Sequence, residues 1–320
     1  MRTALNVLTE ELRRLKAAGV KSVSVSEESV ETLRKVVAAR KGARAVEKVE
    51  EVGAEVKESG TVKEERAVLR GGGTAPPLAG AVKTVEKKAA PEGVAAVPEP
   101  KAFTLPEGDK ATRMAWLKEK VLKDEVCCAH VRPGKQVVLG VGNLDAQIMF
   151  VGEAPGAEEE VQGEPFVGPA GQLLTKMIGA MGLRREDVYI GNIMNWRPEM
   201  ALNASGVQYG NRPPTAEEMA YCLPNLRAQI EIVNPELIVA LGATAAAGLL
   251  GAGSFKALGE VRGKWKEFAG KPLMVTYHPS YILRNQSNRS KRMIWEDLLK
   301  VMERAELPIS EKQRGYFLDK

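Results

Sequence analysis

The sequence predicts an α/β protein, a three-layer α/β/α sandwich around a four-stranded parallel sheet. Short apolar runs alternate with amphipathic helical segments between about residue 108 and residue 305. Such alternation is typical of parallel strands joined by crossover helices that cover both faces of a sheet. The first aromatic residue is Phe103, so the packed core is expected in the C-terminal part of the chain.

Four apolar runs have the character of buried strands. Each is short and consists mostly of apolar residues. The predicted strands are residues 146–153, 187–194, 236–242 and 271–279.

The segments around these runs have helical periodicity, with apolar residues recurring every three or four positions. One of them also carries a capping box, because Thr215 is followed three residues later by Glu218. The predicted helices are residues 109–126, 170–183, 215–233, 243–251 and 291–305.

The chain divides into four predicted parts. Residues 1–40 have leucines at helical spacing and a capped amphipathic helix, which predicts a small helical module. Residues 41–105 are poor in large apolar side chains and cannot offset their chain entropy by burial, so we expect a disordered linker. A folded domain is predicted at 106–308, followed by a C-terminal tail at 309–320.

Composition limits the functional classes. A net charge of +5 and a pI near 9.0 favour a negatively charged partner such as nucleic acid. The three cysteines do not form a disulfide framework. The sequence shows no signal peptide and no run of membrane-span length, so we expect a soluble, cytoplasmic protein.

Chemically active side chains follow the predicted strands. Ligands of open parallel sheets bind at the carboxyl ends of the strands. Glu153, Asn192, Gly242 and His278 come directly after the four strands, so an acid, an amide and an imidazole are predicted to meet in one crevice. The first of these loops, GEAPGAEEE at 152–160, carries four carboxylates and would repel a phosphate, which argues against a nucleotide-phosphate site.

Several blocks together resemble the family 4 (thermophile-type) uracil-DNA glycosylases. They are GNLDAQIMFVGEAPGAEEEVQGEPFVGPAGQLL, VYIGNIMNWRP, NRPPTAEEMAYCLPNLRAQIEIVNPELIVALGATAA, RGKW and YHPSYILR, and they run from about residue 125 to about residue 300. The resemblance implies a four-stranded parallel sheet between helices. It also implies an enzyme that flips uracil out of DNA and hydrolyses the N-glycosidic bond, leaving an abasic site.

The resemblance assigns roles around the base. Phe166 matches the stacking aromatic, and His278 matches the residue that donates to uracil O2. Asn192 offers both a donor and an acceptor, which matches the edge of uracil and mismatches that of cytosine. The expected catalytic residues are Glu153, His278 and Asn192, and the expected uracil-binding residues are Ala154, Gly156, Phe166, Asn192 and His278.

Of the carboxylates in the acidic loop, Glu153 is the one we expect beside the sugar, because the scissile step builds positive charge there and a nearby carboxylate lowers the barrier. Ala154 stands where related families carry a water-activating aspartate, although backbone amides of 154–156 could still polarise the base. Glu158, Glu159 and Glu160 are predicted to form a solvated loop face, with the alternative that one of them positions the catalytic loop.

A DNA-binding segment is predicted after His278. Tyr281, Ile282, Leu283 and Arg284 resemble the loop that wedges into the base stack, and the basic residues of 284–292 are expected at phosphates. The predicted DNA contacts are Pro279, Ser280, Tyr281, Arg284, Arg289, Lys291 and Arg292.

Two departures from the family stand out. The resemblance implies a [4Fe–4S] cluster on four cysteines. Cys128 and Cys222 match two ligand positions, but Glu125 and Trp196 occupy the other two. We therefore expect no thiolate-held cluster and no other metal, with Trp196 in the core and Cys128 and Cys222 as buried free thiols.

The second departure is an insertion, MALNASGVQYG, that lacks His, Lys and Arg. Some cross-linking relatives within the family resemblance trap the abasic sugar covalently through a histidine-bearing basic insertion near this point, so the resemblance implies no covalent trapping here. The insertion could replace the structural contribution of the cluster or touch DNA.

Two other functions stay open: a weakly active or inactive DNA-binding scaffold, and a glycosylase for another deaminated base such as hypoxanthine or xanthine. Retention of Glu153, Phe166, Asn192 and His278 favours a monofunctional uracil-DNA glycosylase. The expected partners are uracil-containing DNA and a repair or replication protein at the N-terminal module, with the chain itself a monomer.

Overall fold

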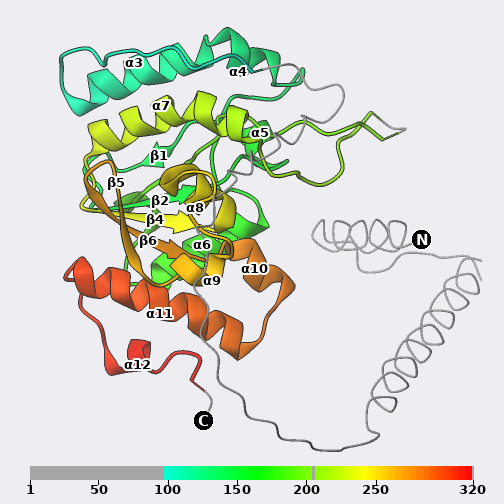
Figure 1. Ribbon diagram of the computed structural model, residues 1–320. Helices are drawn as coiled ribbons and strands as arrows, with labels where there is room; N and C mark the ends of the chain where they lie inside the picture. Colours follow the sequence, from blue (N-terminus) through cyan, green and yellow to red (C-terminus); the bar gives the residue numbers. More distant parts are fainter. Residues whose placement is uncertain (1–96, 204–205, 319–320) are drawn as a thin grey trace, which may run out of the picture. The chain divides into compact units, whose positions relative to one another are not determined.

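The computed structural model describes residues 97–203 and 206–318 (Figure 1). The predicted module at 1–40 and most of the predicted linker at 41–105 lie outside the described residues, so these domain boundaries stay predictions.

A six-stranded sheet forms the middle layer, in the order β1-β3-β2-β4-β6-β5. Its four central strands are mutually parallel, as predicted. They are β2 (Ile148–Gly152), β3 (Tyr189–Asn192), β4 (Leu237–Leu241) and β6 (Lys271–Thr276). Every residue of β2, β3 and β4 is buried, which explains why these strands have nearly continuous apolar runs.

Two antiparallel edge strands were not predicted. They are β1 (Val141–Gly142), which pairs with β3, and β5 (Trp265–Phe268), which pairs with β6. The first has two residues, and the second exposes its two charged middle residues, so neither leaves a clear apolar pattern.

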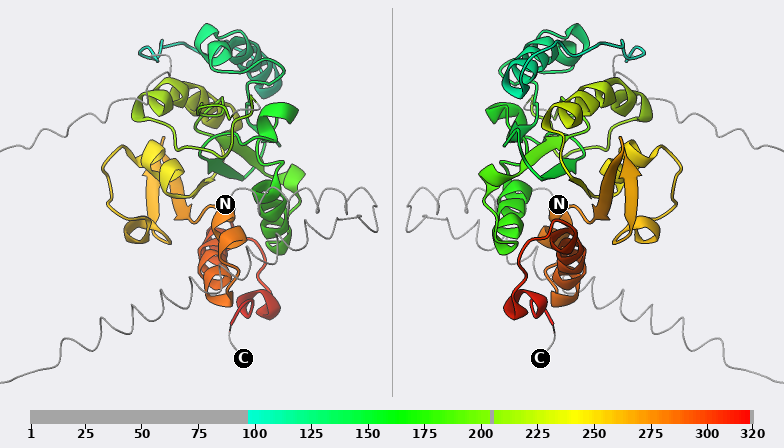
Figure 2. Two further views of the ribbon diagram at one scale, coloured as in Figure 1. Left: turned by 90° about the vertical axis from the view of Figure 1, so that its right-hand side faces the viewer. Right: turned by 90° about the vertical axis from the view of Figure 1, so that its left-hand side faces the viewer.

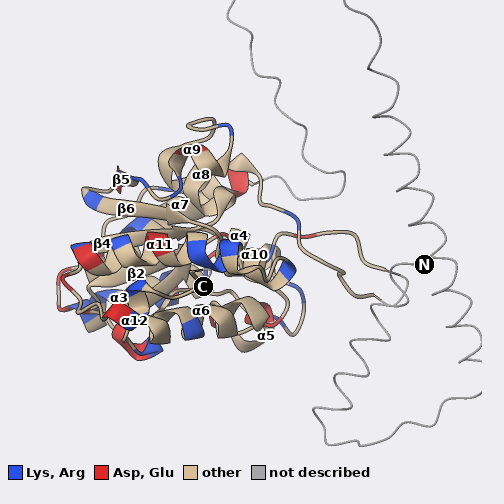
Figure 3. Ribbon diagram, turned by 90° about the horizontal axis from the view of Figure 1, so that it is seen from below, with Lys and Arg blue, Asp and Glu red and all other residues tan. Residues whose placement is uncertain are grey.

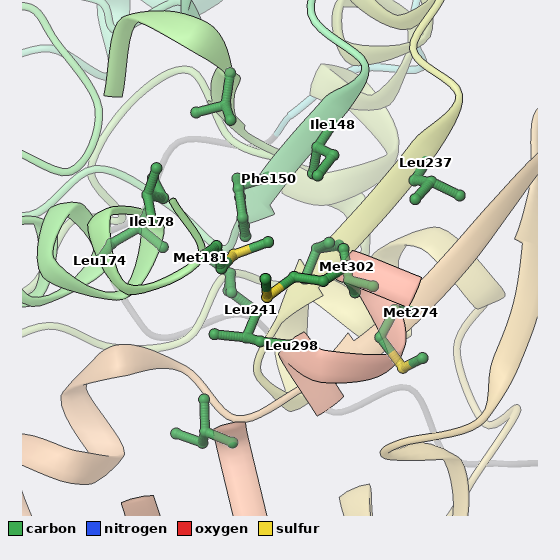
Figure 4. Close-up of a cluster of buried hydrophobic side chains, with 14 of the residues drawn as sticks. Ile148, Phe150, Leu174, Ile178, Met181, Leu237, Leu241, Met274, Leu298 and Met302 are labelled. Carbon is green, nitrogen blue, oxygen red and sulfur yellow. The ribbon is translucent and has the colours of Figure 1, made fainter. Parts of the chain in front are cut away.

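Helices cover both faces of the sheet (Figures 1 and 2). Successive strand residues point to opposite faces, so Phe150 packs toward one helical layer and Met149 toward the other. The layer on the Phe150 side contains α6 (Pro169–Ala180), α10 (Pro279–Arg284) and α11 (Asn288–Arg304). Figure 4 shows this core, where Leu174 and Ile178 of α6 and Leu298 and Met302 of α11 surround the strand residues.

The opposite layer contains α7 (Ala216–Val233) and α8 (Ala243–Leu250). The predicted capping box is present, since the Thr215 side chain accepts from the Glu218 amide and Glu218 accepts from the Thr215 amide. Outside α7 lie α3 (Lys110–Leu122) and α4 (Glu125–Ala129), which divide the single helix predicted at 109–126. Asp124 caps the second of these helices and separates the two.

The remaining described elements are short. They are α5 (Glu159–Gln162), the 3-10 helix η1 (Arg185–Asp187), α9 (Leu258–Val261) and α12 (Glu311–Arg314). None of the described helices is long and apolar enough to span a bilayer.

Both described ends of the chain pack on the domain. The Phe103 ring lies 5.9 Å from that of Trp116 on α3. At the other end, Trp295 Nε1 donates to the Gln313 carbonyl at 2.6 Å, and Arg292 Nη1 donates to the Arg314 and Tyr316 carbonyls at 2.7 and 2.9 Å. The segments next to the predicted boundaries at 106 and 308 therefore add to the packed domain.

Candidate functional site

A crevice of about 550 Å³ lies at the carboxyl ends of the four parallel strands. The sheet topology brings Glu153, Asn192, Gly242 and His278 into its walls, as the strand-end argument predicts. The other predicted site residues that line it are Ala154, Gly156, Phe166, Ser280 and Arg284.

The floor of the crevice is built by a close approach of three residues. Gly152 pairs with Asn192 across β2 and β3. A Cβ atom added to Gly152 would lie 2.3 Å from Asn192 Oδ1 and 2.5 Å from the Phe166 ring, so only glycine fits. The Asn192 side chain is buried, and its Oδ1 has no hydrogen-bond partner among the described residues. A buried acceptor without a partner costs about 1–3 kcal/mol, and a ligand with an N–H group could satisfy it.

Phe166 forms one side of the crevice. Its φ angle is 55°, a left-handed conformation that is uncommon for a bulky residue. Gly171 makes this possible, because a Cβ there would lie 1.7 Å from the Phe166 carbonyl oxygen. The Phe166 ring lies 5.6 Å from the His278 ring, at an angle of 31°. The two rings together provide a surface on which a flat heterocycle could stack.

The surroundings of His278 determine both its protonation state and its tautomer. It is the N-cap of α10, and its Nδ1 accepts from the Ser280 backbone N–H at 3.1 Å. Burial, with a smaller effect of the nearby Arg284, lowers the pKa of His278 from 6.5 to about 4. A neutral ring whose Nδ1 is an acceptor carries its proton on Nε2. At neutral pH His278 is therefore an uncharged Nε2–H donor.

Glu153 lies at the end of β2. Burial raises the pKa of its carboxyl group above the ordinary 4.5, and a hydrogen bond with the Thr244 side chain opposes that rise. Thr244 belongs to the first turn of α8, which begins after β4. Glu153 is therefore the carboxylate in the crevice that directly follows a central strand.

The acidic loop is structured by its own carboxylates, which corrects the prediction of a solvated face for Glu159 and Glu160. Glu159 accepts from the Gly156 amide at 3.0 Å and from the Gly168 amide at 3.1 Å, joining the two ends of the loop. Glu160 is buried and accepts from Arg197 Nη1 at 2.9 Å. Glu158 alone of the three is exposed. The alternative that one glutamate positions the loop fits Glu159.

The predicted DNA-binding segment forms α10 and the start of α11, where Figure 3 marks a group of basic residues. Leu283, Arg284 and Arg289 are exposed, and Lys291 is partly exposed. Ile282 is buried, and Tyr281 stacks on Tyr277 at 4.4 Å, so both pack on the core in this structure. Arg292 was expected at phosphates, but it binds C-terminal carbonyls and Glu296 instead. Pro279 is buried at the first turn of α10.

The positions implied for the iron–sulfur cluster are packed as a hydrophobic core. Trp196 is fully buried, and its ring stacks on that of His130 at 5.0 Å and 10°. Cys222 is buried, as expected. Cys128 is exposed and donates to the Leu122 carbonyl, so the prediction that it is a buried thiol is wrong. Cys127 is the buried neighbour, and a hydrogen bond with Cys222, together with burial, raises the pKa of its thiol.

These residues do not fit a thiolate-held cluster. Two thiols, Cys127 and Cys222, face each other, whereas a [4Fe–4S] cluster takes four ligands. Within residues 97–203 and 206–318, no group of three or more His, Cys, Asp or Glu side chains could hold a metal ion.

Sequence reasoning missed four residues at the site. Asn211 and Arg212 line the crevice, and the buried Arg197 donates to Asn211 Oδ1 at 2.8 Å. Thr244 contacts Glu153. A signal was present for all four, since Arg197 lies in the NWRP part of one block that carries the resemblance, and Asn211, Arg212 and Thr244 lie in another, which runs from NRPP to GATAA.

The fold and site define an α/β protein with a crevice at the carboxyl ends of its parallel strands, lined by an acid, an amide and an imidazole. The chain belongs to the uracil DNA glycosylase superfamily, whose sequence model matches residues 139–299.

Known relatives agree with the resemblance to family 4. A type-4 uracil-DNA glycosylase of Thermotoga maritima is 46% identical over 188 residues, which cover 58% of this chain and 92% of the relative. One of Saccharolobus solfataricus is 41% identical over 176 residues, covering 53% and 76%. A type-5 uracil-DNA glycosylase of Pyrobaculum aerophilum is 32% identical over 174 residues, covering 51% and 73%.

Proposed function

We propose that this chain is a monofunctional uracil-DNA glycosylase, which hydrolyses the bond between uracil and deoxyribose and leaves an abasic site. The observation that carries the proposal is the unpartnered Oδ1 of the buried Asn192 on the crevice floor. An N–H group of an extruded base would satisfy this acceptor. Uracil offers that group at N3, beside the O4 acceptor that the amide nitrogen could serve, whereas cytosine presents an acceptor at N3.

Stacking and hydrogen bonding would act together on the base. The paired rings of Phe166 and His278 support a planar ligand beside Asn192. Base–aromatic stacking contributes about 1–3 kcal/mol per base. Because Gly152 has no side chain, the Asn192 amide and the Phe166 ring both lie close to it, and we place the edge of the pyrimidine against this floor.

The chemical step needs charge stabilisation at two places. The C1′–N1 bond breaks and its electron pair leaves with uracil, so negative charge develops on the base and positive charge on the sugar. The neutral His278 can donate its Nε2–H to the developing oxyanion without first losing a charge. The ionised carboxylate of Glu153 stabilises the positive charge that develops on the sugar. Water then adds at C1′ and releases a proton, giving uracil and the abasic sugar.

The pocket residues would bind the extruded base, and the basic residues near the pocket would bind the phosphates. Arg284 lines the crevice. Arg289 follows it in the chain and is exposed in the first turn of α11. Their charges suit the phosphates around the extruded nucleotide. We expect the enzyme to act as a monomer on DNA in the cytoplasm, and the predicted module at 1–40 to bind a repair or replication protein.

We also propose that the enzyme works without an iron–sulfur cluster. The support is the packing of Trp196 against His130 at a cluster position. In this chain the hydrophobic contacts of Trp196 would hold β3 and α7 together where a cluster would otherwise link the cysteines.

Uracil release from an oligonucleotide, read out as strand cleavage after alkali, tests the function. We expect cleavage by the wild type and a loss of at least about 100-fold for Asn192→Ala and for His278→Ala. Asn143→Ala is the matched control and should keep full activity. Asn143 is exposed, and its backbone amide donates to the carbonyl of Val188, which lies at the end of β3 opposite the crevice. Oligonucleotides with hypoxanthine or xanthine test the other deaminated bases.

Binding of uracil DNA without cleavage by the wild type would contradict the proposal and support the scaffold alternative. Equal activity of the wild type and both pocket variants would show that another site releases the base.

A further inference from the structure

We infer that residues 200–203 and 206–210 form a second DNA contact, an uncharged finger whose Tyr209 stacks on a base next to the extruded nucleotide. This inference rests on the proposed function. It assigns a role to the insertion that the family resemblance leaves open, and its ligand class is the nucleobases of the flanking strand.

The finger is continuous with the crevice wall. Arg197 is buried and donates from Nη2 to the Gly210 carbonyl at 2.7 Å and from Nε to Asn211 Oδ1 at 2.8 Å. The same guanidinium is fixed by Glu160 of the acidic loop. Asn211 lines the crevice, so Tyr209 stands two residues from the wall of the pocket.

The stem of the finger is also held in place. Leu202 and Gln208 form an antiparallel bridge. Gln208 is buried, accepts from the Met200 amide at 3.2 Å and donates to the Pro198 carbonyl at 3.0 Å. Arg132 donates to the Met200 carbonyl at 2.8 Å. The described base of the finger is therefore anchored on the domain on both legs.

The side chains carried by this anchored stem are apolar and exposed. Leu202, Val207 and Tyr209 are 50%, 53% and 50% exposed. Exposed apolar side chains that cluster on one fixed element mark an interaction site more often than scattered ones do. Residues 200–211 contain no Lys, Arg, Asp or Glu, so they have no charge with which to hold phosphates.

The place of the finger indicates which partner covers it. The strand ends, the finger and α10 lie on the same side of the domain (Figures 1 and 3). The crevice is lined by Asn211 and Arg212 next to the finger and by Arg284 of α10. On α10, Leu283 is also exposed. In this proposal, DNA that places a nucleotide in the crevice passes α10 on one side and the finger on the other, with basic residues for its phosphates and the finger for its bases.

A thermodynamic cycle tests this inference by combining substitutions in the protein with removal of bases from the DNA. Fluorescence anisotropy would measure the Kd of the full chain for single-stranded uracil oligonucleotides, either intact or with the bases on one side of uracil replaced by abasic linkers. Three variants are compared with the wild type: Tyr209→Ala, Tyr209→Phe and Leu122→Ala. Leu122 is the control, because it is an exposed apolar residue on α3 that does not line the crevice.

For intact DNA we expect Tyr209→Ala to weaken binding by roughly 5- to 100-fold, with Tyr209→Phe and Leu122→Ala near the wild type. Removing the flanking bases on the contacted side should weaken the wild type by a similar factor and leave Tyr209→Ala almost unchanged. The salt dependence of the Kd should be the same for Tyr209→Ala and the wild type, since no phosphate contact is lost.

The inference is overturned if Tyr209→Ala binds every oligonucleotide as the wild type does, or if it loses equal affinity with and without flanking bases. The first result would indicate that the finger binds a protein partner and not DNA. Because the readout is binding, uracil release by the same wild-type preparation separately decides the proposed function.

Discussion

The Phe166 ring lies 5.6 Å from the His278 imidazole, although one residue follows β2 and the other follows β6. The pair forms only because the parallel sheet brings both strand ends to one edge. Phe166 holds a left-handed backbone angle, and His278 holds Nδ1 against its own helix, so both rings are fixed before any ligand arrives. Preorganised groups avoid reorganisation during the reaction.

Gly152→Ala should remove most uracil release while leaving the domain folded. The added methyl group would lie within 2.5 Å of Phe166 and 2.3 Å of Asn192 Oδ1, so the crevice floor must move. We expect a fall of at least about 100-fold in kcat/KM. Gly179→Ala is the matched control, because nothing lies within 4 Å of a Cβ at that position of α6. This control should keep activity and gain about 0.5–1 kcal/mol in urea unfolding. Equal activity of both variants would contradict the geometry.

The stability of the domain should depend on His278 below neutral pH. Its pKa is about 4 in the folded protein, below the ordinary 6.5. A lowered pKa means that the stabilisation is complete above pH 6.5 and is lost as the pH falls toward 4. His278→Asn keeps an N-cap side chain and removes this titration. Across that window the wild type should lose up to about 3 kcal/mol more than the variant in urea unfolding. Parallel pH curves would show that His278 is not buried as described.

The acid limb of the activity profile should follow Glu153. Burial raises its pKa above 4.5, and the Thr244 hydrogen bond opposes that rise. The ionised form is the active one, so kcat/KM should fall as the pH drops through this raised pKa. Thr244→Val removes the hydrogen bond and should move the acid limb to higher pH. Glu153→Gln should be slow and lack that limb. An unmoved limb in Thr244→Val would assign it to another group.

Glu159 should affect catalysis without touching the base. Its carboxylate joins the Gly156 and Gly168 amides, so Glu159→Ala frees the loop that carries Ala154 and Phe166. We expect kcat to fall about 10- to 100-fold, with a smaller change in stability. Glu164→Ala is the control, since Glu164 is an exposed acid of the same loop. If both variants behave alike in single-turnover assays, loss of charge rather than loop anchoring is the cause.

Trp196 should be a large contributor to stability. It is fully buried and stacked on His130, and Trp196→Ala should cost about 3–5 kcal/mol in urea unfolding. Trp116→Ala, which truncates a partly exposed tryptophan on α3, should cost less. The wild-type preparation should be colourless and free of iron by elemental analysis. Iron in stoichiometric amounts would contradict the cluster-free proposal.

Much of the fold and the pocket could be predicted from the sequence. The central strands are buried on both faces, so their apolar runs are plain, and Glu153, Asn192 and His278 follow them directly. Parallel topology then places these residues at one edge without further information. The edge strands β1 and β5 have too few apolar residues to be visible.

The remaining assignments depended on how a helix is rotated about its axis and on contacts between residues far apart in the chain. Cys127 and Cys128 are adjacent in the chain, and only the orientation of α4 decides that Cys127 meets Cys222 while Cys128 is exposed. The roles of Glu159 and Glu160 depend on amides and a guanidinium distant in sequence. The sequence by itself determined the order of the strands in the chain and the chemistry at their ends, because burial leaves a local pattern. Tertiary structure alone decided which carboxylates are anchored, which thiol is buried and where the finger stands, because these depend on contacts that no local pattern records.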